Sequence, residues 1–207
     1  MLVGNDIVDL GDPEAALDSL HPRFVARVFT EAERRAIERS PDPRAELWAY
    51  WAAKESAYKA LKKLDPHLVF AHSTFVVNLD SRCGQARRAG TVSHGSERLL
   101  VAITTNADWV HAVATDEAPD RGGVAGCRLI AHVSRSPAAC NQSDTVRLCA
   151  RRVLAQALDH TPRDLSVVGS RPPRLRVGDR LADLDLSLSH HGRWVSFAAL
   201  VPLARID

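Results

Sequence analysis

The stretch that decides the fold is RAELWAYWAAKESAYKALKK, from Arg44 to Lys63. It contains neither proline nor glycine, and the segment Pro41-Asp42-Pro43 breaks the chain just before it. Its apolar side chains recur near the helical period, at Leu47, Trp51, Tyr58 and Leu61. The pattern therefore predicts one long helix over Arg44–Lys63.

Shorter patterns on either side of this helix predict strands and further helices. Val3–Leu10 is expected to be a strand, and Thr30 with Glu33 has the capping-box spacing for a helix from Glu31 to about Arg39. Two more helices are expected over Arg23–Val28 and Asp144–Leu158. The remaining extended segments are His72–Leu79, Leu99–Thr104, Asp108–Thr115, Arg128–Val133, Leu165–Val168 and Leu184–Leu200.

A glycine-rich segment divides the chain. TDEAPDRGGVAG, over residues 115–126, combines glycine, proline and charge without apolar periodicity. We expect a first half over 1–118, a linker over 119–126 and a second half over 127–207. ADWVHAVAT from Ala107 and GRWVSFAAL from Gly192 share a Trp-Val pair, which favours two related halves, although any half-buried strand has a similar pattern.

Composition excludes several classes of protein. The 207 residues are 45% hydrophobic and 25% charged, which is typical of a soluble globular chain, and the net charge of +2 lacks the bias of a general nucleic-acid binder. No stretch approaches the ~20 apolar residues of a membrane span, and Asp6 and Asp9 interrupt the apolar start that a signal peptide would need. The four cysteines form no CxxC pair, so a metal knuckle is not expected. These features predict a cytoplasmic protein that binds neither nucleic acid nor membrane.

Asp6 is the first residue that could carry chemistry. It lies in GNDIVDL, between apolar residues, where an ionised carboxylate must accept hydrogen bonds or face a cation. Strand alternation puts Asp6 and Val8 on one face and Ile7 and Asp9 on the other, so Asp6 and Asp9 are not a natural metal pair. By itself Asp6 is more often a cap or an ion-pair partner than a metal ligand.

WAAKESAYK, residues 51–59, is the second candidate. Glu55 and Lys59 lie one helical turn apart, with Lys54 beside them. A solvated Glu-Lys pair is one interpretation. The other is a charge cluster held at a cleft, because this turn of the helix is otherwise apolar.

SLSHHGRW, residues 187–194, is the third candidate. Ser189 and His190 follow an alternating strand and precede Gly192, so they lie near a turn suited to binding phosphate. A structural histidine is the alternative. His190 and His191 are expected to point in different directions, which makes a two-histidine metal site improbable.

Together, GNDIVDL, RVFTEAE (27–33), WAAKESAYKA and SLSHHGRWV resemble the 4'-phosphopantetheinyl transferase superfamily. The resemblance implies an α+β fold of two similar α/β halves with antiparallel sheets and pseudo-twofold symmetry. In the pseudo-dimeric members that activate peptide synthetases the Ser-His block comes first, whereas here it comes last, as in the small trimeric holo-acyl-carrier-protein synthases. The chain therefore resembles a permuted pseudo-dimer, or equally a small synthase with a fused second copy, and is expected to be a monomer.

This resemblance implies an activity and a set of residues. The family transfers the 4'-phosphopantetheine arm of coenzyme A to a serine of an apo acyl or peptidyl carrier protein and releases adenosine 3',5'-bisphosphate. By resemblance Asp6 and Glu55 hold magnesium, and Lys59 contacts the pyrophosphate with Lys54 alongside. These imply Asp6, Glu55 and Lys59 as catalytic residues, and either Glu55 or metal-bound water as the base for the carrier serine. Coenzyme A would also meet Ser189, His190, Arg147 and Arg171, the first three at its 3'-phosphate.

Further expectations concern neighbouring positions. Many pseudo-dimeric members have a second acidic residue at the position of Val8. This chain and the small synthases have valine there, so the metal would keep an additional water. Glu33 could orient a catalytic group. A carrier's acidic helix would meet a rim containing Arg23, Arg27 and Lys62. Fatty-acid, polyketide and non-ribosomal peptide carriers all satisfy the pattern.

Two other functions compete with transfer. One is a non-catalytic carrier-binding module with the same fold. Joint retention of the acids, the lysine and the histidine argues against it. The other is a metal-dependent phosphodiesterase that removes the same arm, a class that needs a richer His and Asp ligand set.

Overall fold

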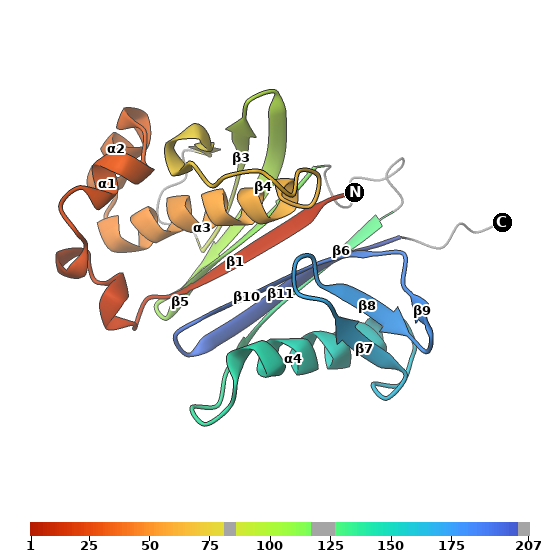
Figure 1. Ribbon diagram of the computed structural model, residues 1–207. Helices are drawn as coiled ribbons and strands as arrows, with labels where there is room; N and C mark the ends of the chain where they lie inside the picture. Colours follow the sequence, from red (N-terminus) through yellow and green to blue (C-terminus); the bar gives the residue numbers. More distant parts are fainter. Residues whose placement is uncertain (81–85, 117–126, 203–207) are drawn as a thin grey trace.

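The computed structural model describes residues 1–80, 86–116 and 127–202, so the expected linker at 119–126 lies outside the described residues (Figure 1). The first of two lobes is built on an antiparallel five-stranded sheet with strand order β1-β5-β4-β3-β2. Its strands are β1 (Val3–Asp9), β2 (Val76–Leu79), β3 (Arg87–His94), β4 (Glu97–Thr105) and β5 (Trp109–Thr115).

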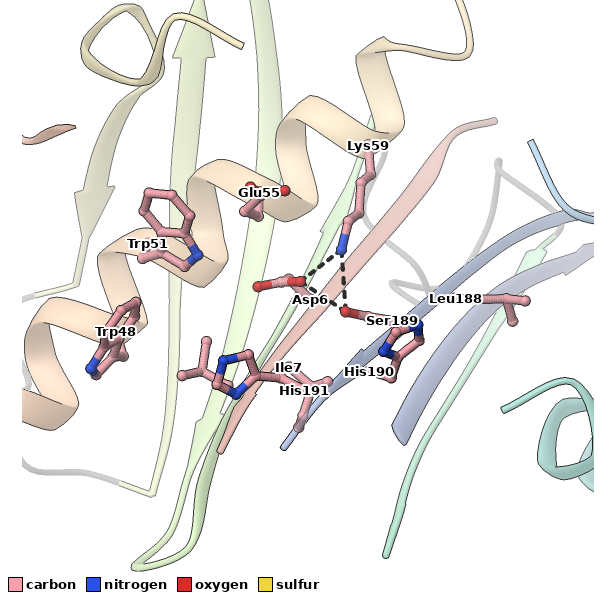
Figure 2. Close-up of a pocket in the computed structure, with 11 residues that line it drawn as sticks. Asp6, Ile7, Trp48, Trp51, Glu55, Lys59, Leu188, Ser189, His190 and His191 are labelled. Atoms are coloured by element: carbon pink, nitrogen blue, oxygen red, sulfur yellow. Dashed lines mark hydrogen bonds and ion pairs between the residues drawn. The ribbon is translucent and has the colours of Figure 1, made fainter. Parts of the chain in front are cut away.

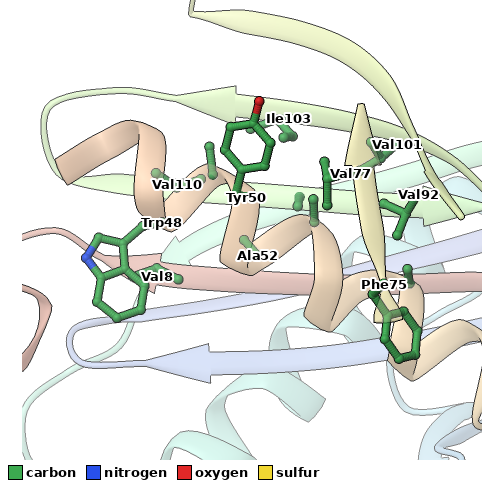
Figure 3. Packing of buried hydrophobic residues seen from close by; sticks show 14 of the residues in the cluster. Val8, Trp48, Tyr50, Ala52, Phe75, Val77, Val92, Val101, Ile103 and Val110 are labelled. Carbon is green, nitrogen blue, oxygen red and sulfur yellow. The ribbon is translucent and has the colours of Figure 1, made fainter. Parts of the chain in front are cut away.

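Helix α3 (Pro43–Leu61) packs along this sheet against β1 and β5. Figure 3 shows the resulting core, in which Trp48 and Ala52 of the helix join strand residues such as Val101 and Ile103. The helix lies so close to β1 that a Cβ atom added at Gly4 would fall 1.8 Å from the carbonyl oxygen of Ser56. Glycine at this position is what allows the side chains of α3 to reach the edge of β1.

Short helices fill the chain between β1 and α3. α1 (Phe24–Val28) and α2 (Glu31–Glu38) follow one another, and the predicted capping box at Thr30 and Glu33 is confirmed at the start of α2. The described residues also include three 3₁₀ helices, Pro13–Ala15, Leu17–Ser19 and His72–Thr74. Among the described residues no helix is both long enough and apolar enough to cross a membrane.

The second lobe repeats the combination of sheet and helix on a smaller scale. Helix α4 (Gln142–Ala157) packs against a three-stranded sheet of order β10-β11-β6 and against the neighbouring sheet β7-β8-β9. The strands are β6 (Cys127–Arg135), β7 (Leu165–Val168), β8 (Arg174–Val177), β9 (Arg180–Leu181), β10 (Asp185–His191) and β11 (Trp194–Pro202). Val146, Leu154 and Phe197 are at the centre of its core.

The main sheets of the two lobes have the same local strand order. In the first lobe, the final strand β5 lies between the first strand β1 and the preceding strand β4. In the second, β11 lies between β6 and β10 in the same way. Trp109 and Trp194, the tryptophans of the two similar sequence segments, begin β5 and β11, and their ring centroids are 6.3 Å apart.

The lobes meet along the edge of β1 that is not paired with β5. The N–H of Val3 donates to a carboxylate oxygen of Asp185 at 2.7 Å. The N–H of Asn5 donates to Oγ of Ser187 at 3.0 Å, and the N–H of Asp9 donates to Nδ1 of His191 at 3.0 Å. Alternate side chains of β10 therefore satisfy alternate backbone amides of β1, so the two sheets join without a backbone ladder between them.

Most of the predicted elements are confirmed, and the differences have physical reasons. The extended segment 184–200 is two strands, because Gly192 adopts a φ of 53° and turns β10 into β11. Strand β3 was not predicted, since its sequence RRAGTVSH has little of the apolar alternation that marks a strand. Strands β8 and β9 were also missed, because they are only four and two residues long, too short for a reliable periodic signal.

The seam between the lobes should respond to acid through Asp9. This side chain is 1% exposed. Burial alone would raise its pKa, but hydrogen bonds from the side chain and backbone of Arg193 and from the Gly11 N–H outweigh burial and lower the pKa to about 2. A lowered pKa contributes stability above the unfolded value near 4 that is lost as pH falls toward 2. We expect wild-type unfolding free energy, from urea titrations, to fall over this range.

Asp9→Asn should lack this acid-dependent step. At neutral pH it should be less stable than wild type by no more than about 2 kcal/mol, because the partly exposed Arg193 is screened by solvent. Asp18→Asn, at an exposed position, serves as the matched control and should behave as wild type. Parallel acid titrations of wild type and Asp9→Asn would contradict this assignment.

Candidate active site

A cleft of about 350 Å³ lies where α3, β1 and β10 meet (Figure 2). Charged and polar side chains from all three elements line it: Asp6, Glu55, Lys59, Ser189 and His190. Trp48 and Trp51 form an apolar wall on the α3 side. Three sequence blocks far apart in the chain thus converge on one cleft.

The centre of the cleft is a hydrogen-bonded triad. Nζ of Lys59 lies 2.6 Å from Oδ1 of Asp6 and donates to Oγ of Ser189 at 3.2 Å. The hydroxyl of Ser189 in turn donates to the same Oδ1 at 2.8 Å. Lys59 also donates to the backbone carbonyl of Asn5 at 3.2 Å. Asp6 is therefore held by one residue from each lobe.

Glu55 faces the same cleft as Asp6. Burial, and after it the negative charge of Asp6, raises the pKa of Glu55 to about 7 against the opposing effect of Lys59. Within the described residues nothing donates a hydrogen bond to the Glu55 carboxylate or to Oδ2 of Asp6. Two neighbouring carboxylates thus share a single lysine, which leaves an excess of negative charge.

This donor chemistry fits a hard divalent cation. Magnesium prefers carboxylate oxygens and is usually bound by one or two of them, together with water and substrate phosphates. In the described part of the chain, no cluster of three or more His, Cys, Asp or Glu residues has a metal-binding arrangement. The ion that suits Asp6 and Glu55 is therefore one that takes further oxygens from elsewhere.

The two histidines border the cleft in different ways. His190 is exposed, and desolvation followed by the charges of Lys59 and His191 lowers its pKa, which favours the neutral ring. His191 has Nδ1 occupied by the N–H of Asp9. Both line the cleft, and because their contacts differ they form no paired metal site.

Lys54 is not in the cleft, which corrects its predicted contact with coenzyme A. Its side chain is 0% exposed, and Nζ lies 2.8 Å from Oε2 of Glu33. It also donates to the carbonyls of Phe75 at 2.6 Å and His72 at 3.2 Å. A residue adjacent to Glu55 on a helix points about 100° away from it. Lys54 therefore faces the interior of the lobe, and Glu33 positions Lys54 rather than a group in the cleft.

Arg147 and Arg171 also lie outside this cleft. The guanidinium of Arg147, on α4, donates to the carbonyls of Val167 at 3.0 Å and Gly169 at 2.7 Å. It borders a separate pocket between α4 and β7. Arg171 is exposed on the chain between β7 and β8. The structure thus brings Ser189 and His190 to the acids, and leaves both arginines elsewhere on the second lobe.

Sequence reasoning missed Asn5, which precedes Asp6 on β1 and whose side chain reaches across the seam to the second lobe. Its Nδ2 donates to Oγ of Ser196 at 2.6 Å and lies 3.4 Å from Nε2 of His111. Burial lowers the pKa of His111 to about 4, so this ring is neutral. The available signal was an asparagine at a period-two position between Val3 and Ile7, where a buried amide must find partners.

Comparison with known proteins identifies the family of the first lobe. The model of the 4'-phosphopantetheinyl transferase superfamily matches residues 2–114. This range contains Asp6, Glu55 and Lys59. Ser189 and His190, which complete the cleft, lie beyond it.

Similar proteins bear the name holo-acyl-carrier-protein synthase. The one from Phenylobacterium zucineum is 36% identical over 119 residues, which cover 56% of this chain and 83% of the relative. Those from Beijerinckia indica and Caulobacter vibrioides are 35% identical over 116 residues and 36% identical over 118 residues, and the matches cover 81% and 86% of these relatives.

The placement of Lys54 generates a test of stability. Lys54→Met leaves the buried Glu33 carboxylate without its cation, and breaking a buried ion pair costs about 3–5 kcal/mol. We expect a loss of this size in the unfolding free energy from urea titrations. Lys59→Met, at the partly exposed position in the cleft, should lose much less.

The double variant Glu33→Gln/Lys54→Met distinguishes an ion pair from a general packing defect. It should be more stable than the Lys54→Met variant, because the uncompensated buried charge is gone. If the stability losses of the single variants Glu33→Gln and Lys54→Met add up to the loss of the double variant, the two residues are not paired.

Proposed function

This chain belongs to the 4'-phosphopantetheinyl transferase superfamily, and we propose that it transfers the 4'-phosphopantetheine arm of coenzyme A to a serine of an apo acyl carrier protein. The observation that carries the proposal is the convergence of Asp6, Glu55 and Lys59 with Ser189 and His190 on one cleft. The first three come from the lobe that matches the family, and the last two come from the other lobe. The names of the similar proteins support the same activity.

The reaction forms a bond between the carrier serine oxygen and the β-phosphorus of coenzyme A and breaks the bond to adenosine 3',5'-bisphosphate. The proton of the serine hydroxyl would pass to Glu55 or to water. Asp6 and Glu55 would hold magnesium, which supplies positive charge against the diphosphate when bound. The ammonium group of Lys59, which now contacts Asp6, would also interact with the leaving phosphate and stabilise its negative charge. Ser189 and His190 would fix coenzyme A from the side of the second lobe.

The shared strand order supports a pseudo-twofold origin of the two lobes. Each lobe has a first strand, a long helix and a final strand inserted beside the first. We place the division as the sequence predicts it, with halves at 1–118 and 127–207. Because one chain supplies both walls of the cleft, we also propose that the protein works as a monomer.

A basic rim beside the cleft would receive the carrier. Arg23 and Arg27 are exposed on or next to α1, whose Phe24 ring lies 5.5 Å from the ring of Trp51 in the cleft wall. Lys62 is less suited than predicted, because Nζ donates to the carbonyl of Leu68 at 2.5 Å. The surface therefore offers two arginines to the acidic helix of a carrier.

Intact-mass analysis of an apo acyl carrier protein tests the activity. With coenzyme A and magnesium, the carrier should gain one phosphopantetheine arm. Lys59→Met should lower the rate at least about 100-fold, because it removes a charge that acts on the transition state. Arg176→Glu, at an exposed position on β8, is the matched control and should retain wild-type rate.

The other outcomes separate the competing functions. An unchanged apo carrier that still binds the protein would establish a binding module in place of a transferase. Loss of the arm from a holo carrier would establish hydrolysis. Full activity after removal of divalent ions by EDTA would refute the magnesium site.

Charge reversal tests the docking surface. Arg23→Glu/Arg27→Glu should raise the KM for the carrier about tenfold, which corresponds to loss of about 1.4 kcal/mol of favourable contact, and leave the KM for coenzyme A unchanged. Arg176→Glu/Arg180→Glu, on the β8–β9 hairpin of the other lobe, is the control of equal charge change. Equal KM values in both double variants would exclude α1 as the docking surface.

A further inference from the structure

The outward edge of β1 has a repeating pattern of contacts. The backbone of Leu2 accepts from the N–H of Asp116, and the N–H of Leu10 donates to the carbonyl of Asp108. Even-numbered residues at both ends of β1 thus bond toward β5, and by alternation the backbone groups of Val3, Asn5, Ile7 and Asp9 face away from it. These four residues present their N–H and C=O groups to α3 and β10.

Two lysines cover the first two outward carbonyls, Lys59 on α3 and Lys63 in the turn that follows it. Nζ of Lys63 donates to the carbonyl of Val3 at 2.6 Å, and Nζ of Lys59 donates to the carbonyl of Asn5 at 3.2 Å. Four helical residues rise about 6 Å and two strand residues about 6.7 Å, so the helix and the strand stay in step over short distances. The same step leads from Lys59 to Glu55 on α3, and from Asn5 to Ile7 on β1.

The third position breaks the pattern. Glu55 places a carboxyl group where the two preceding positions have an ammonium group, and no side chain of the described residues donates to the Ile7 carbonyl. Ser189, which by the spacing of β10 would cover the N–H of Ile7, instead donates to Asp6. Ile7 nevertheless lines the cleft, together with Asp6 and Glu55. At this point the edge of β1 therefore presents a carbonyl oxygen beside two carboxylates.

We propose that the backbone carbonyl oxygen of Ile7 is a further ligand of the divalent cation held by Asp6 and Glu55. The cation would take the position that the lysine ammonium groups have at Val3 and Asn5. A backbone carbonyl is an oxygen donor of the kind hard cations accept. It would also supply an oxygen to which no side chain of the described residues donates a hydrogen bond. The inference rests on the magnesium site of the proposed function.

The sequence makes this carbonyl directly observable. Ile7-Val8 is the one Ile-Val dipeptide in the chain, so protein labelled with [1-¹³C]isoleucine and [¹⁵N]valine gives a single HNCO signal for the Ile7 carbonyl. Additional [¹⁵N]threonine reports Ile103-Thr104 in β4 as a control carbonyl of the same residue type. Magnesium chloride is titrated into the whole protein, first alone and then with saturating coenzyme A.

The Ile7 carbonyl resonance should shift with magnesium in a saturable manner, while that of Ile103 stays in place. Glu55→Gln should weaken the apparent magnesium affinity at least about tenfold in the same titration. Glu55→Lys provides the positive control, because its ammonium group would extend the lysine series. In that variant the Ile7 resonance should already be displaced without magnesium and should no longer respond to it.

The outcomes separate this inference from the proposed function. If transfer requires magnesium but the Ile7 resonance does not move at saturating magnesium and coenzyme A, the carbonyl is not a ligand and the transferase proposal stands. If neither transfer nor the resonance responds to magnesium, both the metal site and this inference fail. If the Ile7 resonance responds equally to magnesium in Glu55→Gln and in wild type, the response does not come from the cation at Glu55, and the inference fails. The Glu55→Gln variant provides this test even if Glu55→Lys does not fold.

Discussion

The free edge of β1 is the feature on which the rest of the structure depends. A strand edge exposes unsatisfied N–H and C=O groups, and proteins must cover or charge such edges. Here β10 covers the amides of Val3, Asn5 and Asp9 with side chains, and lysines from the end of α3 and the turn after it cover the carbonyls of Val3 and Asn5. This arrangement joins the lobes without merging their sheets. It also places polar groups from three distant segments along one line.

At the candidate active site, the side chains that face the edge of β1 change from basic to acidic. At Val3 and Asn5, the ammonium groups of Lys63 and Lys59 donate to the outward carbonyls of β1. At Glu55 the helix presents an acid where a lysine would continue the series. The local charge becomes negative, and the pKa of Glu55 rises to about 7 through burial and the nearby Asp6. Two neighbouring carboxylates repel each other and do not stabilise the fold, whereas a cation-dependent reaction of a diphosphate requires them.

A buried and a partly buried lysine–carboxylate pair serve different purposes in this fold. Lys54 and Glu33 lie in the interior, where they tie α3 to the start of α2 and to the chain before β2. Lys63 and Asp185 cross the seam and align α3 with the start of β10. Neither lines the cleft. Lys59, one turn from Lys63, is the lysine of this helix that reaches the cleft, because the close approach at Gly4 holds α3 in register with β1.

The sequence by itself determined the elements with strong local signals and the blocks that carry the chemistry. The period of 44–63, the capping box at Thr30 and the apolar run of β1 depend on neighbours within one or two turns, so they can be read from residue order. The resemblance brought Asp6, Glu55, Lys59, Ser189 and His190 together as a set. Only the tertiary structure decided that Lys54 is buried, that Arg147 and Arg171 lie apart, and that Asn5 spans the seam. These facts depend on the rotation of α3 over β1 and on the alignment of β10 alongside β1, which residue spacing does not specify.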